Sequence, residues 1–299
     1  MGIFNTLFGR KQSTPAPAAT APAVPAAPPA PAPLAAIQTM IDSGLISIAA
    51  QPRNNALDLS DPSIERLYAF LIFKDKIAPS LDRLAPSAEV IGSVNVVARE
   101  NGAFVGHNTD GIGFVAGLLN EYPGCVAGQK VVILGAGGTA LPISYELAKE
   151  KPSEVVIVNR TVAKAQVIAD LIAPLTTARA VGEDVLGDEL ASAGLVVNTS
   201  NKGAQPNEKF SAFAAMTGDV DADLAQSMAN LARLPKEAIV ADILLEDLPL
   251  TLKLAREAGN RTHSGQHMNL FQAAPAFKIL TGLDKPDLEL LDIMRKAIG

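Results

Sequence analysis

Short apolar runs alternate with helical patterns along the second half of the chain, from about Lys130 onward. The four runs rich in Val, Ile and Leu are KVVILG, EVVIVNR, GLVVNTS and AIVADILL. Continuous apolar strands separated by helices are typical of a parallel sheet that is covered on both faces. The pattern therefore predicts an α/β domain built on a doubly wound parallel sheet.

The segments that flank this domain have patterns of their own. Two strand-like runs in SVNVVARENGAFVGHNTD meet at Asn101-Gly102, which predicts a β-hairpin. GIGFVAGLLNEYP, directly after it, predicts a helix. NLFQAAPAFKILTG and PDLELLDIMRKAIG predict two helices at the end of the chain, and these must pack back on the rest of the protein.

The pattern upstream of the hairpin is less regular. SDPSIERLYAFL begins with a helix-start signal, in which Ser60 or Asp61 is the cap and Pro62 lies in the first turn. KIAPSLDRLAPSAEVIG predicts a short helix and a turn. LAAIQTMIDSGLISIAA fits either one helix or a helix followed by a strand. These segments predict a second, smaller α/β domain.

The first 33 residues differ in composition from the rest. Residues 13–33 hold eight of the 21 prolines and little that could form a core, which predicts a disordered Pro/Ala-rich linker. Residues 1–12 are amphipathic and fit the myristoylation pattern of Gly2 followed by Thr6. We expect this segment either to dock weakly on a membrane or a protein, or to be a frayed end. We expect the rest of the chain to form a smaller substrate domain over 34–114, the sheet domain over 115–262 and C-terminal helices over 263–299.

Composition narrows the class of protein. The 299 residues are 48% apolar and 19% charged with a net charge of −6, which suits a globular protein and gives no reason to expect a nucleic-acid partner. Cys125 is the only cysteine, which excludes an internal disulfide framework and a cysteine-based metal site. His107, His263 and His267 show no metal-ligand spacing, so we expect no metal. We expect a cytoplasmic monomer or homodimer, peripheral to a membrane or an assembly where residues 1–12 dock.

A glycine-rich turn, Gly135-Ala136-Gly137-Gly138 followed by Thr139, lies directly between a predicted strand and a predicted helix. Such glycines permit a tight turn and let a pyrophosphate reach the backbone N–H groups and the positive end of the helix dipole. A second strand follows about twenty residues on. This context favours a dinucleotide-binding, Rossmann-like domain over a purely structural turn.

The end of the second strand indicates which dinucleotide is bound. A site for NAD usually has an acidic residue there, which binds the ribose 2′-hydroxyl. This chain instead has Asn159, Arg160, Thr161 and Lys164. Because a guanidinium pairs bidentately with phosphate oxygens, this set favours the 2′-phosphate of NADP over the alternative that Arg160 is a solvated surface charge.

The third strand ends in Asn198, Thr199 and Ser200. The carboxyl ends of strands in this fold face the crevice in which ligands bind. These side chains either meet the nicotinamide side of the cofactor or cap the next helix. The residue types alone leave both roles open.

Several motifs together resemble the shikimate dehydrogenase family. IGSVNVV (91–97) is similar to its Gly-Ala-Val-Asn-Thr signature, and GHNTDGIGF (106–114) to its Asn-Thr-Asp-Gly-x-Gly motif. GAGGTA and VNRTVAK are similar to its cofactor turn and its NADP-reading segment. Gly265, Met268 and Gln272 match its C-terminal Gly-x-x-Met-x-x-x-Gln segment. The resemblance covers about residues 70–283.

The resemblance implies reversible hydride transfer, in which NADPH reduces the ketone of 3-dehydroshikimate to shikimate in aromatic amino acid biosynthesis. It implies that Lys74 and Asp110 are catalytic, although a surface lysine and a helix cap are their structural alternatives. An alkoxide that forms at the ketone needs a cation or a proton donor, and a lysine oriented by an aspartate supplies both. The other roles that it implies are substrate binding by Asn95, Asn108 and Gln272, and cofactor binding by Gly265 and Met268.

The substrate side departs from the family pattern. Residues 34–60 contain no His-Ser-x-Ser-Pro motif, and the motif around Lys74 is degraded. Leu245 replaces a substrate-binding Tyr, Leu141 stands where the cofactor turn commonly has Arg, and 207–233 has no family counterpart. A site that loses polar partners for its substrate loses specificity for it.

Three hypotheses follow from this pattern. The first is an NADP-dependent oxidoreductase that acts on dehydroshikimate, quinate or an altered cyclic polyol or carboxylate. The second is a catalytically silent homologue that binds NADP or acts as a tethered scaffold. The third is another two-domain dehydrogenase, which the SVN and NTDG motifs disfavour. We favour the first.

Overall fold

A computed structural model describes residues 46–48, 66–67, 69–71, 77–283 and 285–298. The chain divides into two compact units, Met1–Ala30 and Pro31–Gly299, and every described residue belongs to the second. The predicted amphipathic segment, the Pro/Ala linker and Lys74 lie outside the described residues. Within the described part, no helix has the length and apolar character that a membrane span requires.

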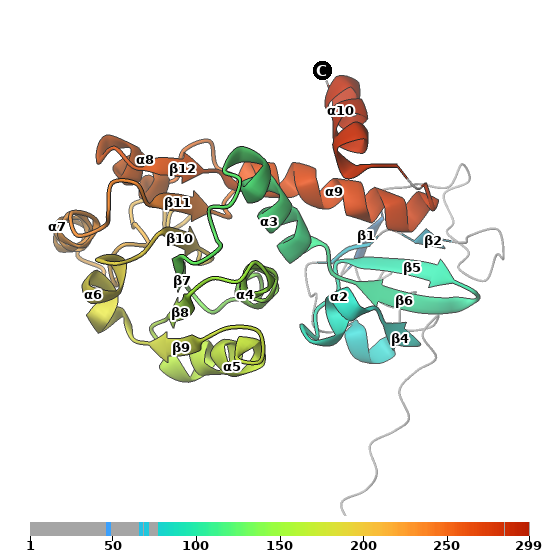
Figure 1. The fold of residues 1–299 in the computed structure, drawn as a ribbon, viewed down its shortest axis with the longest axis horizontal. Coiled ribbons are helices and arrows are strands. Elements are labelled where there is room, and N and C mark those ends of the chain that lie inside the picture. The colour runs from blue at the N-terminus through green and yellow to red at the C-terminus, as the bar shows by residue number, and fades with distance from the viewer. Residues whose placement is uncertain (1–45, 49–65, 68, 72–76, 284, 299) are drawn as a thin grey trace, which may run out of the picture. The chain divides into compact units, whose positions relative to one another are not determined.

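The larger of the two α/β parts is built on a parallel sheet of six strands (Figure 1). Its order is β9-β8-β7-β10-β11-β12, which is the 3-2-1-4-5-6 order of a doubly wound dinucleotide-binding sheet. The predicted fold class is therefore confirmed. The strands are β7 (Lys130–Leu134), β8 (Glu154–Val158), β9 (Ala178–Val181), β10 (Leu195–Asn198), β11 (Ile239–Asp242) and β12 (Arg261–His263).

Both faces of this sheet are covered, which explains why its central strands are apolar except at their end residues. Alternate strand residues point to opposite faces, so Ile133 enters one core cluster and Val132 the other. The first cluster is covered by α3 (Asp110–Glu121), α4 (Ala140–Lys149) and α5 (Val162–Ile172). The second is covered by α6 (Leu186–Leu190), α7 (Val220–Leu231) and α8 (Leu250–Glu257).

The predicted β-hairpin is confirmed. β5 (Val96–Glu100) and β6 (Ala103–His107) pair antiparallel around Asn101 and Gly102, whose φ angles are 51° and 86°. Asn and Gly suit a two-residue turn of this kind because both tolerate positive φ. The hairpin lies at the centre of a four-stranded sheet in the order β2-β5-β6-β4, with β2 (Arg66–Leu67) and β4 (Arg83–Leu84) at its edges.

The predicted helix in SDPSIERLYAFL is wrong in its described part. Arg66–Leu67 is a strand that pairs with β5, and Ala69–Leu71 forms β3, which pairs with β1 (Ile46–Ile48). Pairing with distant strands overrides the local helix-start signal here. In the next segment, η1 (Ala78–Ser80) and α2 (Pro86–Glu89) flank β4, a short strand that the sequence pattern does not reveal.

The helix α3 packs closely on two other helices. A side chain at Gly113 would come within 2.5 Å of the backbone of Gln272 in α9, and one at Gly111 within 2.2 Å of Pro142 O in α4. α9 (Gly265–Thr281) also contacts β2 and β5 of the smaller sheet, and its Met268 lies in the core of the larger one. The two predicted C-terminal helices are confirmed as α9 and α10 (Asp287–Ile298).

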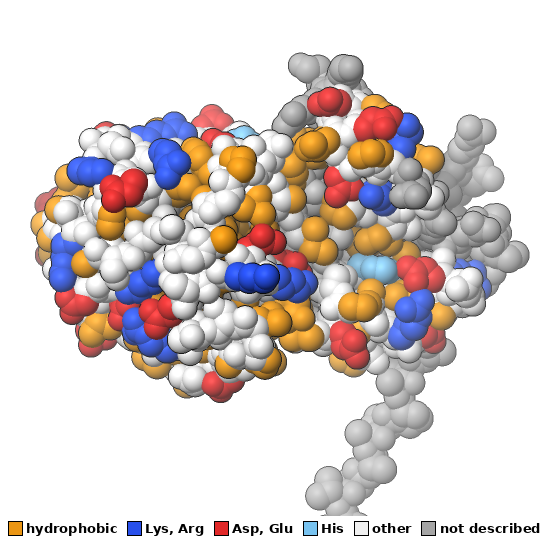
Figure 2. Space-filling view, viewed as in Figure 1, with side chains coloured by type: hydrophobic (Ala, Val, Ile, Leu, Met, Phe, Trp, Pro, Cys, Tyr) orange, Lys and Arg blue, Asp and Glu red, His pale blue; other side chains and the backbone are white. Residues whose placement is uncertain are grey.

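The described surface carries charges of both signs. On the face shown in Figure 2, Lys and Arg side chains are interspersed with Asp and Glu side chains. This distribution agrees with the modest net charge of −6. It differs from the single-sign basic stripe that is typical of a nucleic-acid-binding face.

Candidate functional site

A cavity of about 610 Å³ lies at the carboxyl ends of β7, β8 and β10. The strand order reverses between β7 and β10, and ligands of open α/β sheets bind at such a point. The cavity brings together nine of the residues predicted to bind a cofactor. These are Gly135, Ala136, Gly137, Asn159, Arg160, Thr161, Lys164, Thr199 and Ser200.

The glycine turn is shaped by its neighbours. Gly135 has a φ of +108°, and a β-carbon there would lie 3.1 Å from the backbone nitrogen of Ser200. The Asn159 side chain accepts a hydrogen bond from Ala136 N (3.2 Å) and donates one to Thr161 O (2.9 Å). Asn159 therefore holds the turn against the end of β8 and leaves the turn backbone along the cavity wall.

Two cations lie at the β8 side of this cavity. Arg160 and Lys164 are exposed and line it. Within the described part of the chain, no ion pair joins either of them to an acidic side chain. Thr161 precedes α5 as its N-cap residue but makes no side-chain capping bond, so its hydroxyl is available to a ligand. Two cations and a hydroxyl form a suitable environment for a phosphate group.

The end of β10 is held by its own hydrogen bonds. The Thr199 hydroxyl donates to Leu134 O (3.1 Å), and the Ser200 hydroxyl donates to Asn198 Oδ1 (2.7 Å). Neither side chain caps a helix, because the next described helix, α7, begins at Val220 with Asp219 as its cap. Thr199 and Ser200 line the cavity, whereas Asn198 is fully buried behind it.

Four other predicted cofactor residues do not line the cavity. Gly138 and Thr139 follow the turn, and Thr139 is the N-cap residue of α4. A side chain at Gly265 would come within 2.4 Å of the carbonyl group of Ile243, which lines the cavity. Gly265 thus permits close packing behind the cavity wall. Met268 is buried in the core.

Sequence reasoning missed several residues that line this cavity, among them Lys202, Ala212 and Met216. Lys202 lines the cavity, and its ammonium pairs with Glu183 Oε1 at 2.6 Å. Ala212 and Met216, which belong to the unmatched 207–233 segment, also line it. The sequence did not indicate that Ala212 and Met216 line a cavity, because their segment contains no recognised motif. The segment therefore forms part of the cavity wall.

Asp242 is a buried carboxyl group next to this site, and sequence reasoning missed it too. It accepts hydrogen bonds from Asn198 Nδ2 and Leu244 N, both at 2.9 Å. Burial raises the pKa of Asp242 from 3.8 to about 7, and these hydrogen bonds oppose the rise. The folded protein thus binds a proton at Asp242 more tightly than the unfolded chain does.

This raised pKa predicts that stability falls as the pH rises. The contribution of Asp242 is fully present below about pH 4 and is lost as the pH passes through 7, at a cost of up to about 4 kcal/mol at pH 8. We expect Asp242→Asn to reduce the difference in unfolding free energy between pH 5 and pH 8, measured by urea denaturation. The exposed Asp188→Asn is the matched control. An unchanged pH dependence in Asp242→Asn would contradict the raised pKa.

A second polar group forms at the start of α3. Asn95 Nδ2 donates to Asp110 Oδ1 (2.9 Å) and to the Thr109 hydroxyl (3.0 Å), and Asn95 Oδ1 accepts from Thr109 N (2.9 Å). Asp110 is 2% exposed. It is the first residue of α3, where the helix dipole favours a carboxylate, while Thr109 occupies the cap position. The end of the hairpin thereby fixes the Asp110 side chain.

Asn108 and Gln272 lie beside this group. Asn108 Nδ2 donates to Ser93 O (3.0 Å), and Asn108 Oδ1 accepts from Asp110 N (3.1 Å). Gln272 packs on Gly113, which lies one helical turn after Asp110 on the same helix. Its Nε2 donates to Asn269, while its buried Oε1 has no hydrogen-bond partner among the described residues. The structure thus brings four predicted substrate-side residues to the α3 region.

Two positions that depart from the family pattern, Leu245 and Leu141, can be located in the structure. Leu245 is 55% exposed. Leu141 is partly buried and packs against the core cluster beneath α4. Most of 34–60 and of the stretch around Lys74, where the sequence departs from the family motifs, lies outside the described residues.

Comparisons with known proteins give consistent matches. A family model described as Shikimate / quinate 5-dehydrogenase matches residues 118–203. The chain is 36% identical over 220 residues to a shikimate dehydrogenase (NADP(+)) of Alkaliphilus metalliredigens, covering 71% of each chain. Its fold is similar to that of shikimate 5-dehydrogenase from Listeria monocytogenes in complex with shikimate and NAD (26% identity, TM-score 0.64, covering 87% of this chain and 81% of that one). It is also similar to a ligand-free 5-ketofructose reductase of Gluconobacter sp. (31% identity, TM-score 0.57, covering 76% of each chain).

Proposed function

The chain belongs to the shikimate / quinate 5-dehydrogenase family, and on that basis we propose that it is an NADP-dependent oxidoreductase. The reaction is reversible hydride transfer between NADPH and the ketone of a cyclic keto acid, with 3-dehydroshikimate and shikimate as the pair. The cavity between the glycine turn, Arg160 and Lys164 is the observation that carries this proposal.

The cavity residues fit a dinucleotide that carries a 2′-phosphate. The backbone of the Gly135–Gly137 turn would hold the pyrophosphate at the N-terminus of α4. Arg160, Lys164 and the Thr161 hydroxyl would hold the 2′-phosphate. The Listeria monocytogenes structure contains NAD, and the protein of Alkaliphilus metalliredigens uses NADP(+). In this chain, two cations that have no acidic partner among the described residues support NADP.

When bound, the nicotinamide ring supplies or accepts the hydride. The chain's own contribution is to position the substrate and to move a proton. Asp110, held by Asn95, would orient the ammonium of Lys74 and accept a hydrogen bond from a substrate hydroxyl. Gln272 Oε1, which has no partner in the described part of the chain, offers a further acceptor for a hydroxyl. Lys74 would give its proton to the oxygen that becomes the alcohol.

A different substrate is the second candidate, because the sequence lacks the motif with which the resembling family would bind a carboxylate. No serine pair of the family type occurs in 34–60, and Leu245 replaces the tyrosine. The Gluconobacter relative is a 5-ketofructose reductase, and 5-ketofructose has no carboxylate. An uncharged keto-polyol would leave fewer buried polar groups unpaired in such a site.

Spectrophotometric assays separate these candidates. The chain is incubated with shikimate or quinate and NADP⁺, and with 5-ketofructose and NADPH, and the nicotinamide absorbance is followed. Turnover of shikimate supports the first proposal, and turnover of 5-ketofructose alone moves the substrate to a keto-polyol. Binding of NADP⁺ by calorimetry without turnover of any of them would instead identify a catalytically silent homologue.

We propose a cytoplasmic location for this enzyme and a docking role for residues 1–12, which lie outside the described residues. The amphipathic pattern of that segment and the proline-rich stretch after it support docking. Co-sedimentation with anionic vesicles should be lost when residues 1–33 are deleted, while NADP⁺ affinity stays the same. Equal sedimentation of both chains would exclude the docking role on membranes.

A further inference from the structure

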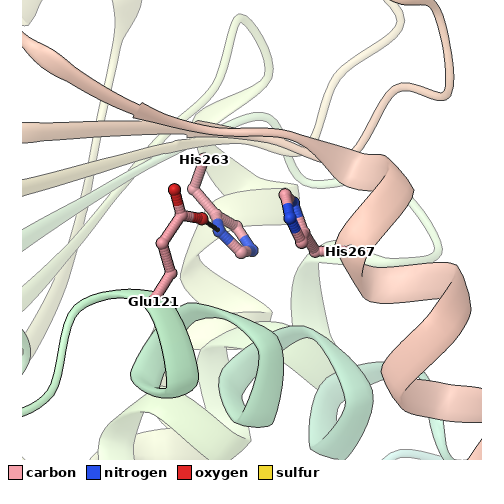
Figure 3. A group of neighbouring side chains, drawn as sticks. All are labelled: Glu121, His263 and His267. Atoms are coloured by element: carbon pink, nitrogen blue, oxygen red, sulfur yellow. Dashed lines mark hydrogen bonds and ion pairs between the residues drawn. The ribbon is translucent and has the colours of Figure 1, made fainter. Parts of the chain in front are cut away.

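Glu121 of α3 meets His263 and His267, which follow it by more than 140 positions, where α3, β12 and α9 come together (Figure 3). Glu121 is the last residue of α3, His263 is the last residue of β12, and His267 lies in the first turn of α9. One ligand atom from each of them lies within 4.8 Å of the others. The sequence spacing of the three histidines gave no sign of this group, but two of them belong to it. The third, His107, pairs with Glu100 in the smaller sheet.

His263 is buried and His267 is half-buried, and each ring has one buried nitrogen atom without a hydrogen-bond partner among the described residues. His263 is fully buried, and its Nδ1 lies 2.8 Å from Glu121 Oε2. Its Nε2, together with Nδ1 of His267, has no hydrogen-bond partner among the described residues. The rings are stacked with their centroids 5.0 Å apart. Buried polar atoms are normally satisfied, so two orphan nitrogens in stacked rings call for a shared partner.

We propose that Glu121, His263 and His267 form a binding site for a divalent first-row transition metal ion, with Zn²⁺ as the fitting ion. Imidazole nitrogens and a carboxylate oxygen are ligands that Zn²⁺ takes, at about 2.0–2.2 Å. Ligands at that distance lie about 3–4 Å from one another around a tetrahedral ion. Small side-chain rotations bring the three residues from their present spacing to that geometry.

The surroundings suit an ion at this place. The absence of a side chain at Gly117 leaves room, because a β-carbon there would lie 3.6 Å from His263 Nε2 and 3.4 Å from the His267 β-carbon. The ring of Phe114, which is also on α3, packs edge to face against His263 with the ring centroids 5.7 Å apart. Burial also favours the uncharged imidazole, which is the form that binds metals. The Glu121 side chain is 35% exposed, so an ion can enter beside it and keep water in a remaining position.

The consequence of such a site would be structural. A bound ion would tie the end of α3 to β12 and to the first turn of α9, without taking part in the proposed hydride transfer. It would therefore stabilise the fold in proportion to the free ion concentration. This inference does not depend on the proposed function, because its readouts do not include turnover.

Zinc titration of the full chain tests the site. The protein is treated with a chelator, desalted and titrated with Zn²⁺ in competition with a chromophoric indicator. We expect one ion to bind with a dissociation constant of about 1 μM or below. Glu121→Gln, His263→Asn and His267→Asn should each weaken binding by at least about tenfold. The matched controls His107→Gln and Cys125→Ser should bind as the unmodified chain does.

Two further readouts keep the proposal decisive if the buried His263→Asn variant fails to fold. Co²⁺ should give visible absorption bands that Glu121→Gln and His267→Asn reduce and that His107→Gln retains. A Zn²⁺ concentration of one hundred times the dissociation constant should raise the melting temperature by about 5 °C in the chain and in His107→Gln. Zinc affinity that is equal in Glu121→Gln, His267→Asn and His107→Gln would overturn the proposal, as would the absence of binding.

Discussion

Replacing Asp110 by Asn is expected to lower kcat for shikimate oxidation by about 10²–10⁴-fold, the range typical of general acid–base groups. The substitution keeps the size of the side chain, and its amide oxygen can still accept the hydrogen bond from Asn95. It removes the negative charge that would hold and orient the ammonium of Lys74. Initial rates at saturating NADP⁺ and shikimate measure the loss.

The control for this variant separates catalysis from folding. Glu89→Gln removes an exposed carboxylate from the same part of the chain and should leave kcat unchanged. NADP⁺ affinity and the melting temperature should be similar in Asp110→Asn and the unmodified chain. If Asp110→Asn turned over at more than a tenth of the normal rate, Asp110 would have no catalytic role.

Lys74 lies outside the described residues, so a double-mutant cycle is the way to connect it to Asp110. If the two side chains act as a unit, Lys74→Ala combined with Asp110→Asn should be little slower than the worse single variant. Multiplicative losses would mean that the two residues act independently.

Arg160→Ala is expected to weaken NADPH binding by about 10–100-fold, because charge-assisted hydrogen bonds to a phosphate contribute about 1.5–3 kcal/mol. NADH has no 2′-phosphate, so its affinity should change less than about threefold. Calorimetric titration of both nucleotides measures the ratio. The NADPH affinity of Arg160→Lys should lie between that of the unmodified chain and that of Arg160→Ala, since an ammonium keeps the charge and loses the bidentate geometry.

Arg233→Ala is the matched control for Arg160→Ala. Arg233 is also an exposed arginine of the large-sheet domain, but it pairs with Asp188 at 2.6 Å and does not line the cavity. The Arg233→Ala substitution should leave the affinities for NADPH and NADH unchanged. Equal weakening of NADPH and NADH by Arg160→Ala would refute the 2′-phosphate role.

The sequence predicts an element well where a local residue pattern is enough to determine the structure. The short apolar runs of β7, β8, β10 and β11, which are separated by helical patterns, are typical of strands buried on both faces. Asn101-Gly102 has positive φ angles that few other residue pairs adopt easily. The cofactor-side residues also follow from local order, because they lie at strand ends that the fold brings to one edge.

Other elements depend on contacts that a local pattern does not contain. β9 is half-buried at the sheet edge, and β12 consists of Arg, Thr and His, so neither has the apolar run of a central strand. Arg66–Leu67 becomes a strand only because Ala98 and Val97 lie beside it. Glu121 and His263 are 142 positions apart in the chain, and no spacing rule connects them. Asp242 resembles any residue at a strand end until its burial is known.

The glycines of α3 have a consequence for how the protein is made. Gly in a helix interior costs about 1 kcal/mol relative to Ala, so α3 is a weak helix by itself. Gly113 packs closely against Gln272, which the ribosome adds more than 150 residues later. Domains fold as synthesis proceeds from the N-terminus, so this face of α3 stays uncovered until α9 emerges. A nascent chain that stalls before α9 is complete would expose this face to chaperones and proteases.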